Sequence, residues 1–190
     1  SCVFSSDIQQ TASQGTAIRN GRSLVFHKCL FKNLGVGIEA NTAAAANANF
    51  SVIQCTFDQI ADDAIALRQE AAGFVAGNYF RNIGGFAIGN STGTTSTDAT
   101  SSLVAVRNVY NNVGGQIENS FENLQYEEQT ETGDKFTDSS TGDYSLISSS
   151  VGYGYDSGVR VGIGSRSYAD IGAIQHQDPT GGGNVIVIED

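Results

Sequence analysis

A short phrase recurs along this chain: an aromatic residue, two polar residues, an aliphatic residue and then Gly or Ala, with an isoleucine a few residues later. Clear copies begin at Phe31, Phe57, Phe80 and Tyr110, and a looser first copy runs from Phe4 to Ile18. The aromatic positions are 27, 26, 23 and 30 residues apart. Repeats of about 20–50 residues are typical of solenoids, because one unit cannot bury its apolar face without neighbours. The repeat therefore predicts an architecture, not yet a function.

Residues leading up to each aromatic alternate in character with a period of two. Val25, His27, Cys29 and Phe31 form such a series in the first clear copy. A period of two is typical of a strand with alternate side chains on one face, so we predict that all four point inward. By the same count His27 is a core or rim residue, beside Ile53, Ala76 and Val106 in later repeats.

Strands that recur at this spacing and stack in one direction make a parallel β-helix, in which equivalent residues lie about 4.8 Å apart. The aromatic residues would form one inner column. Two aliphatic columns would be Leu34, Ile60, Ile83 and Val113, and Ile18, Ile38, Ile65, Ile88 and Ile117. Stacked polar residues at a bend can hydrogen-bond from repeat to repeat. That predicted column is Ser6, Asn33, Gln59, Asn82 and Asn112.

The repeat resembles those of the pectate-lyase-like superfamily, the pectin lyase fold, which includes polysaccharide lyases, polygalacturonases and phage tailspikes. The resemblance covers roughly residues 1–120. It implies an all-β, right-handed parallel β-helix solenoid of about five coils, and right-handed crossovers are also the general rule for parallel strands. The resemblance indicates a fold and leaves the function open.

Three segments are predicted: coils over residues 1–120, an acidic connector and C-terminal β cap over residues 121–180, and a Gly hinge with a terminal strand over residues 181–190. The acidic residues of the connector are interpreted as a solvated surface, within a short amphipathic helix that docks Phe121, Leu124 and Tyr126 on the coil end. A calcium site is the alternative, although the spacing matches no EF-hand loop.

Residues 141–146, 150–152 and 170–173 look like the closing segment of many bacterial and phage β-helix proteins, which implies a C-terminal cap. The terminal strand, residues 184–190, is apolar on both faces: Val185 and Val187 on one, Ile186 and Ile188 on the other. Such a strand needs cover on both sides. Another subunit could supply that cover by strand addition, or the chain's own cap could.

The composition and net charge limit the classes of partner that the chain is expected to bind. With 10 basic and 20 acidic residues, the net charge of −10 disfavours nucleic acid and anionic membrane surfaces. No apolar run approaches the roughly 20 residues of a membrane span. The chain opens on a strand-like phrase, whereas solenoids need capping units. We therefore expect a fragment or processed piece, or another chain that covers the N-terminal face.

Cys2, Cys29 and Cys55 occupy one position in successive repeats. A disulfide or metal pair is one interpretation of this column. A stack of small buried thiols is the favoured one, because the count is odd, no His joins the cluster, and neighbouring parallel strands have poor disulfide geometry.

Asp62 and Asp63 are the candidate catalytic residues, because paired carboxylates can protonate a leaving oxygen and activate water in glycoside cleavage. They are similar to the Asp-Asp-x-Ile phrase of polygalacturonases. The further residues that this resemblance requires are missing: Gly85-Phe86-Ala87 stands in place of the His phrase, and Gly115-Gln116-Ile117 has no Arg or Lys. Aspartates also favour bends by accepting backbone N–H groups, so we predict no catalytic set.

A lyase would need a basic residue beside a carboxylate-bound calcium ion. Arg81 and Arg107 occupy different positions in their repeats and do not stack. Lys32, Asp58, Arg81 and Asn111 share one column after the aromatics, interpreted as a solvated, mutually paired face. His176 has no partner pattern, and no triad, phosphate-loop, cofactor or metal motif occurs.

These features favour a non-enzymatic structural or attachment module of a phage virion: a tail spike, a tail fibre or a capsid-attached protein. The expected location is the virion or the extracellular cell surface. The resemblance implies a homotrimer, with other virion proteins as alternative partners and carbohydrate contact along the loop edge. The alternatives are a polysaccharide-cleaving enzyme that uses Asp62 and Asp63, and a secreted bacterial adhesin.

Overall fold

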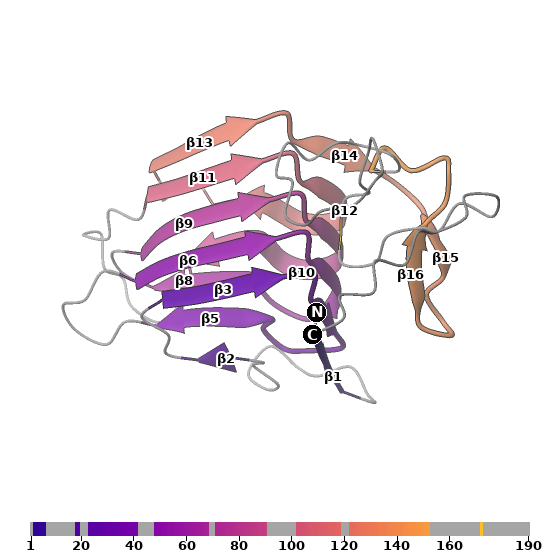
Figure 1. Ribbon diagram of the computed structural model, residues 1–190, viewed down its shortest axis with the longest axis horizontal. Coiled ribbons are helices and arrows are strands. Elements are labelled where there is room, and N and C mark those ends of the chain that lie inside the picture. Colours follow the sequence, from indigo (N-terminus) through magenta and orange to yellow (C-terminus); the bar gives the residue numbers. More distant parts are fainter. Residues whose placement is uncertain are drawn as a thin grey trace, which may run out of the picture.

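The computed structural model describes residues 2–6, 18–19, 23–41, 48–68, 71–90, 102–118, 122–152 and 172. Within these residues the chain is all β, without helices, and its two large sheets are parallel (Figure 1). No helix suited by length and apolar character to a membrane crossing occurs among them. The predicted all-β class with parallel strands is confirmed.

Five strands of similar length form one parallel sheet, in the order β13-β11-β9-β6-β3. Their arrows stack in one direction in Figure 1. Their bounds are β3 (Ser23–His27), β6 (Ala48–Ile53), β9 (Ala71–Ala76), β11 (Ser102–Val106) and β13 (Glu122–Tyr126). Each repeat contributes one strand to this sheet.

The second sheet has nine strands, and the long strand β10 (Tyr79–Asn90) joins its two halves. The first half of β10 pairs with β7, and its end pairs with β8. The half that contains β7 (Thr56–Ile60) also has β1 (Val3–Ser5), β4 (Leu30–Lys32) and β14 (Gln129–Glu131). The other half has β8 (Ile65–Arg68), β5 (Ile38–Asn41) and β2 (Ile18–Arg19). Strand β12 (Val109–Ile117) pairs with β10 along both halves.

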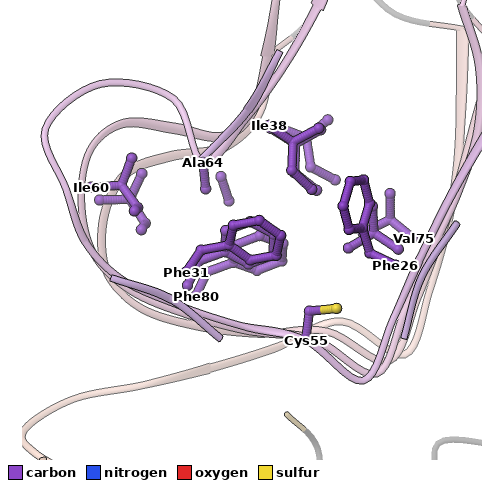
Figure 2. Close-up of a cluster of buried hydrophobic side chains, with 14 of the residues drawn as sticks. Phe26, Phe31, Ile38, Cys55, Ile60, Ala64, Val75 and Phe80 are labelled. Carbon is purple, nitrogen blue, oxygen red and sulfur yellow. The ribbon is translucent and has the colours of Figure 1, made fainter. Parts of the chain in front are cut away.

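The predicted aromatic column is confirmed. Backbone pairing aligns Phe4, Phe31, Phe57, Phe80 and Tyr110 in register. Neighbouring rings stack with centroids 4.6–5.6 Å apart and with interplanar angles of at most 14°. Phe31 and Phe80 overlap in the view of Figure 2, with the side chains of Ile38 and Ile60 beside them. The isoleucine column is in register too, from Ile18 to Ile117.

The predicted inward face of the five-stranded sheet is wrong by one residue. Val25 is 72% exposed, whereas Phe26 is 6% exposed and belongs to the core. A bend with left-handed backbone separates this strand from the next, with φ of 54° at Lys28 and 50° at Gln54. The bend changes the phase of the alternation, so His27 points away from the core with Val25. Its Nε2 lies 3.1 Å from Gln54 Oε1.

The predicted bend column is confirmed as a second left-handed position. Asn33, Gln59, Asn82 and Asn112 have φ between 53° and 57°. Asn tolerates this conformation better than most residues. The amides also link repeats: Asn33 Nδ2 donates to the Ser6 carbonyl at 3.0 Å, and Asn112 Nδ2 donates to Asn82 Oδ1 at 2.8 Å.

The helix predicted within residues 121–134 is wrong, because this segment forms β13 and β14 as a further copy of the strand pair. The parallel sheets thus continue past residue 120 to Glu131. Leu124 and Tyr126, expected to dock, are 64% and 57% exposed. The last copy places polar side chains where earlier copies are apolar, since Gln125 pairs with Ala105 and Thr130 pairs with Tyr110. A polar final repeat suits the end of a stack.

The cysteine column is buried at Cys29 and Cys55 as free thiols, while Cys2 is exposed. Asn78 and Asn108 continue this column in the next repeats. The Cys55 N–H donates to Asn78 Oδ1 at 2.8 Å, and the Asn78 N–H donates to Asn108 Oδ1 at 3.0 Å. These buried amides therefore satisfy backbone groups beside the bend that contains Lys28 and Gln54.

An antiparallel hairpin follows the parallel sheets, formed by β15 (Phe136–Asp138) and β16 (Asp143–Leu146). It packs on the side of the nine-stranded sheet, in a second apolar cluster with Leu30, Tyr79 and Val109. This described part of the predicted cap therefore covers a side of the stack. Gly172 lies against the stack as well, where its N–H donates to the Gly77 carbonyl at 2.9 Å. The Gly hinge and terminal strand, residues 181–190, lie outside the described residues.

Replacing Phe57 in the middle of the aromatic column should strongly destabilise the fold. Phe57 is fully buried between two rings, so Phe57→Ala should lower the free energy of unfolding by about 3–5 kcal/mol. Phe86→Ala is the matched control, because Phe86 is 36% exposed, and it should cost about 1 kcal/mol. Urea unfolding followed by circular dichroism measures both. Equal losses would contradict the buried stack.

Candidate functional site

Asp62 and Asp63 lie at the bend between β7 and β8. Asp63 is 8% exposed, and its Oδ1 accepts the Phe86 N–H at 2.8 Å. Gly85 and Gly89 of the next repeat make room for it, because a Cβ at either position would collide with the Asp63 carboxylate. Asp63 is therefore built into the contact between two repeats.

Burial raises the pKa of Asp63 to about 6, against its ordinary value of 3.8. The hydrogen bond from Phe86 lowers the pKa, and the charges of Asp62 and Glu118 raise it. A carboxyl that holds its proton near neutral pH can act as a general acid. The structure brings Asp63 near Glu118, a residue that the sequence did not connect with it.

The neighbouring repeat supplies Phe86 where a polygalacturonase-like site would require a His phrase. Phe86 pairs with Gly115 of the following repeat, and a Cβ on Gly115 would collide with the Phe86 ring. Glu39 of the preceding repeat is 3% exposed. The surroundings of Asp63 are thus shaped by packing between repeats.

The polar column after the aromatics is in register, as predicted. The pairing aligns Lys32, Asp58, Arg81, Asn111 and, in the last copy, Glu131. The prediction that this column is solvated is wrong. Asp58, Arg81, Asn111 and Glu131 are 0%, 6%, 2% and 8% exposed. The β15–β16 hairpin covers Asp58 and Arg81, whereas Gly133 contacts Asn111, and Ser150 and Val151 contact Glu131.

An ion pair forms the centre of this covered column. Arg81 contacts Asp58 through two nitrogens, with Nε–Oδ1 of 2.8 Å and Nη2–Oδ2 of 3.2 Å. Arg81 also pairs with Asp134, and its Nη2 donates to Ser139 Oγ at 3.1 Å. Burial lowers the pKa of Arg81, but Asp58 and Asp134 raise it by more, so the group stays charged.

The hairpin binds this ion pair through aromatic side chains. Tyr144 donates its hydroxyl to Asp58 Oδ2 at 2.9 Å. The Phe136 ring lies 4.9 Å from the Arg81 guanidinium, and Lys32 Nζ lies 5.4 Å from the Tyr144 ring. Cation–π contacts of this kind are favourable when water is excluded. The hairpin is therefore held by charge as well as by apolar packing.

Glu131 organises the other end of the covered column. Its carboxylate accepts hydrogen bonds from the Tyr79 hydroxyl, from Ser150 Oγ at 2.8 Å and from the Val151 N–H at 3.0 Å. Asn111 Nδ2 donates to Tyr79 Oη at 3.1 Å and to the Gly133 carbonyl at 2.6 Å. The acidic surface predicted from sequence is thus buried at Glu131 and tied to the segment after the hairpin.

A polar cleft of about 460 Å³ opens beside this network. It is lined by Arg81, Asn82, Asn111, Asn112, Thr132, Gly133 and Asp134. Its amide and carboxylate groups can donate and accept hydrogen bonds from hydroxylated ligands. Among the described residues, no group of three or more His, Cys, Asp and Glu is arranged to hold a metal ion. His176 lies outside those residues.

Comparisons of the chain with protein-family models, with curated proteins and with solved structures found no match.

The buried ion pair allows a matched test. Arg81→Ala leaves Asp58 charged and covered, so it should lower the free energy of unfolding by about 3–5 kcal/mol. Arg107→Ala is the control, because the Arg107–Glu127 pair is partly exposed, at 25% and 35%, and should contribute less than about 1 kcal/mol. Denaturant titration distinguishes them, and similar losses would mean that the hairpin does not bury the Arg81 pair.

The buried Asp63 carboxyl should make the stability of the fold depend on pH. Its pKa is raised in the folded state, so the proton is bound more tightly there, and stability is lost as pH rises through about 6. Asp63→Asn removes that loss, so the variant should gain on the wild type between pH 4 and pH 7, by on the order of 2 kcal/mol. Asp62→Asn, at the more exposed neighbour, should gain less. Thermal unfolding at several pH values measures the difference, and a constant difference would contradict the buried carboxyl.

Proposed function

We propose that this chain is a right-handed parallel β-helix, similar to the pectate-lyase-like superfamily, and that it serves as a structural or attachment module of a phage virion. The fold proposal is supported by strands that pair in parallel with their counterparts in the repeats before and after. The hand follows from the general preference of parallel crossovers. A tail spike, a tail fibre or a capsid-attached protein would each use such a module.

The observation that carries this proposal is the continuous aromatic column from Phe4 to Tyr110. A stack in which each repeat is bonded on both sides is elongated and stiff, which suits a protein that presents a surface or bears a load. In the polar column, Asp58 is bonded to Arg81 and to Tyr144 of the hairpin, and the Asp63 carboxylate accepts the Phe86 N–H. These side chains hold the scaffold together.

The proposed place of action is the virion or the extracellular cell surface, and the proposed partners are two further copies in a homotrimer or other virion proteins. Carbohydrate contact is proposed at the polar cleft, because Asn82, Asn112 and Asp134 offer groups that bind sugar hydroxyls. A secreted bacterial adhesin would use the same scaffold. The neighbouring genes distinguish a virion module from an adhesin.

The solution mass of the full chain tests the proposed assembly. The proposed homotrimer predicts that light scattering at micromolar concentration gives a mass of about three chains. A lone chain over the whole concentration range would contradict self-assembly.

A polysaccharide-cleaving enzyme is the second candidate, favoured by the raised pKa of Asp63, about 6, beside Asp62. It predicts that the protein shortens a polysaccharide such as polygalacturonate, and that Asp62→Asn or Asp63→Asn abolishes shortening while binding is kept. The structural proposal predicts no shortening by the wild type. Viscometry of a panel of polysaccharides, with the two variants as controls, decides between them.

A further inference from the structure

The outer face of the five-stranded sheet carries an apolar strip, here called the outer strip. It consists of two neighbouring columns that cross all five strands. The columns are Val25, Ser51, Phe74, Val104 and Leu124, and His27, Ile53, Ala76, Val106 and Tyr126. None of the ten residues is Asp, Glu, Lys or Arg, although the chain has 30 such residues in all, 10 basic and 20 acidic.

Several side chains of the outer strip are open to solvent. Val25, Leu124 and Tyr126 are 72%, 64% and 57% exposed, and Val104 is 36% exposed, whereas Ala76 between them is buried. A shallow hollow of about 680 Å³ lies over the first of the two columns, and Phe74, Val104 and Leu124 are part of its lining. A contiguous apolar surface of this kind usually marks an interaction site.

The dimensions of the outer strip limit what can cover it. Five strands at about 4.8 Å spacing make it about 19 Å long, and two columns make it about 14 Å wide including side chains. The resulting area of about 300 Å² is well below the roughly 800 Å² per partner of a stable protein interface. One extended segment of about seven residues matches the length.

The chain itself brings such a segment close. Gly172 is buried and its N–H donates to the Gly77 carbonyl at 2.9 Å. Gly77 directly follows Ala76, which belongs to the outer strip, so the chain is held at the corner of this sheet at residue 172. Residues 173–183 can span up to about 36 Å when extended, which exceeds the length of the strip.

We propose that residues 184–190 of the same chain lie across the outer strip, with alternate side chains of Val185–Ile188 packed against it. These seven residues lie outside the described residues, and their sequence is apolar on both faces. A tether of 11 residues (173–183) gives the segment an effective concentration in the millimolar range, which favours it over a separate partner. This inference does not depend on the virion role.

Cysteine trapping tests this arrangement in the full-length chain. The background carries Cys2→Ser, since Cys29 and Cys55 are buried. Val104→Cys is combined in turn with a Cys at position 185, 186, 187 or 188, and glutathione buffer oxidises each protein at low micromolar concentration. Mass spectrometry should find the cross-link within one chain at two alternate positions, about tenfold above the other two, because a strand presents every second side chain.

Val3→Cys is the matched control, because Val3 is 68% exposed but lies on the nine-stranded sheet. It should cross-link at least about tenfold less than Val104→Cys with the same tail position. Leu124→Cys repeats the test if Val104→Cys folds poorly. Equal yields at all four tail positions, or with Val3→Cys, would overturn the proposal. Cross-links between chains would overturn it too, and would assign the strip to the tail of a second copy.

Discussion

Each ring of the aromatic column from Phe4 to Tyr110 packs on the column ring of the neighbouring repeat, and that contact sets the register of the neighbouring strands. A slip of one residue would turn every inward side chain outward. The left-handed backbone at Asn33, Gln59, Asn82 and Asn112 holds the bend after each ring at a constant place. The columns on either side of the aromatics, including the polar one, are aligned as a consequence.

The polar column places charged side chains side by side, and the hairpin supplies the partners that these charges need when they are buried. Removing the Arg81–Asp58 pair from water is costly, and only good geometry with further hydrogen bonds repays that cost. Arg81 contacts Asp58 through two nitrogens, and Tyr144 and Asp134 complete the pair. We infer that the charges determine where the hairpin docks, because an apolar surface alone would accept it in several positions. Glu131 likewise accepts a hydrogen bond from Ser150 and so holds the segment after the hairpin.

The columns could be predicted from the sequence because they follow from counting residues between aromatics. The bend at Lys28, Gln54 and Arg107 could not, since none of these residue types marks a left-handed backbone, and the inward face was misplaced by one residue as a result. The burial of Asp58 was missed because its cover, Tyr144, comes 86 residues later. At the candidate site, Asp62 and Asp63 were located, but the packing of Asp63 against Gly89 depends on contact between repeats.

The distance between spin labels at Val25 and Leu124 tests the in-register stack most directly. The two residues belong to one column at opposite edges of the five-stranded sheet. Labels at Val25→Cys and Leu124→Cys, with Cys2→Ser, should give one narrow distance distribution by pulsed electron spin resonance. The backbone separation should be about 19 Å, four strand spacings. A broad distribution, or one centred beyond about 35 Å, would contradict the account.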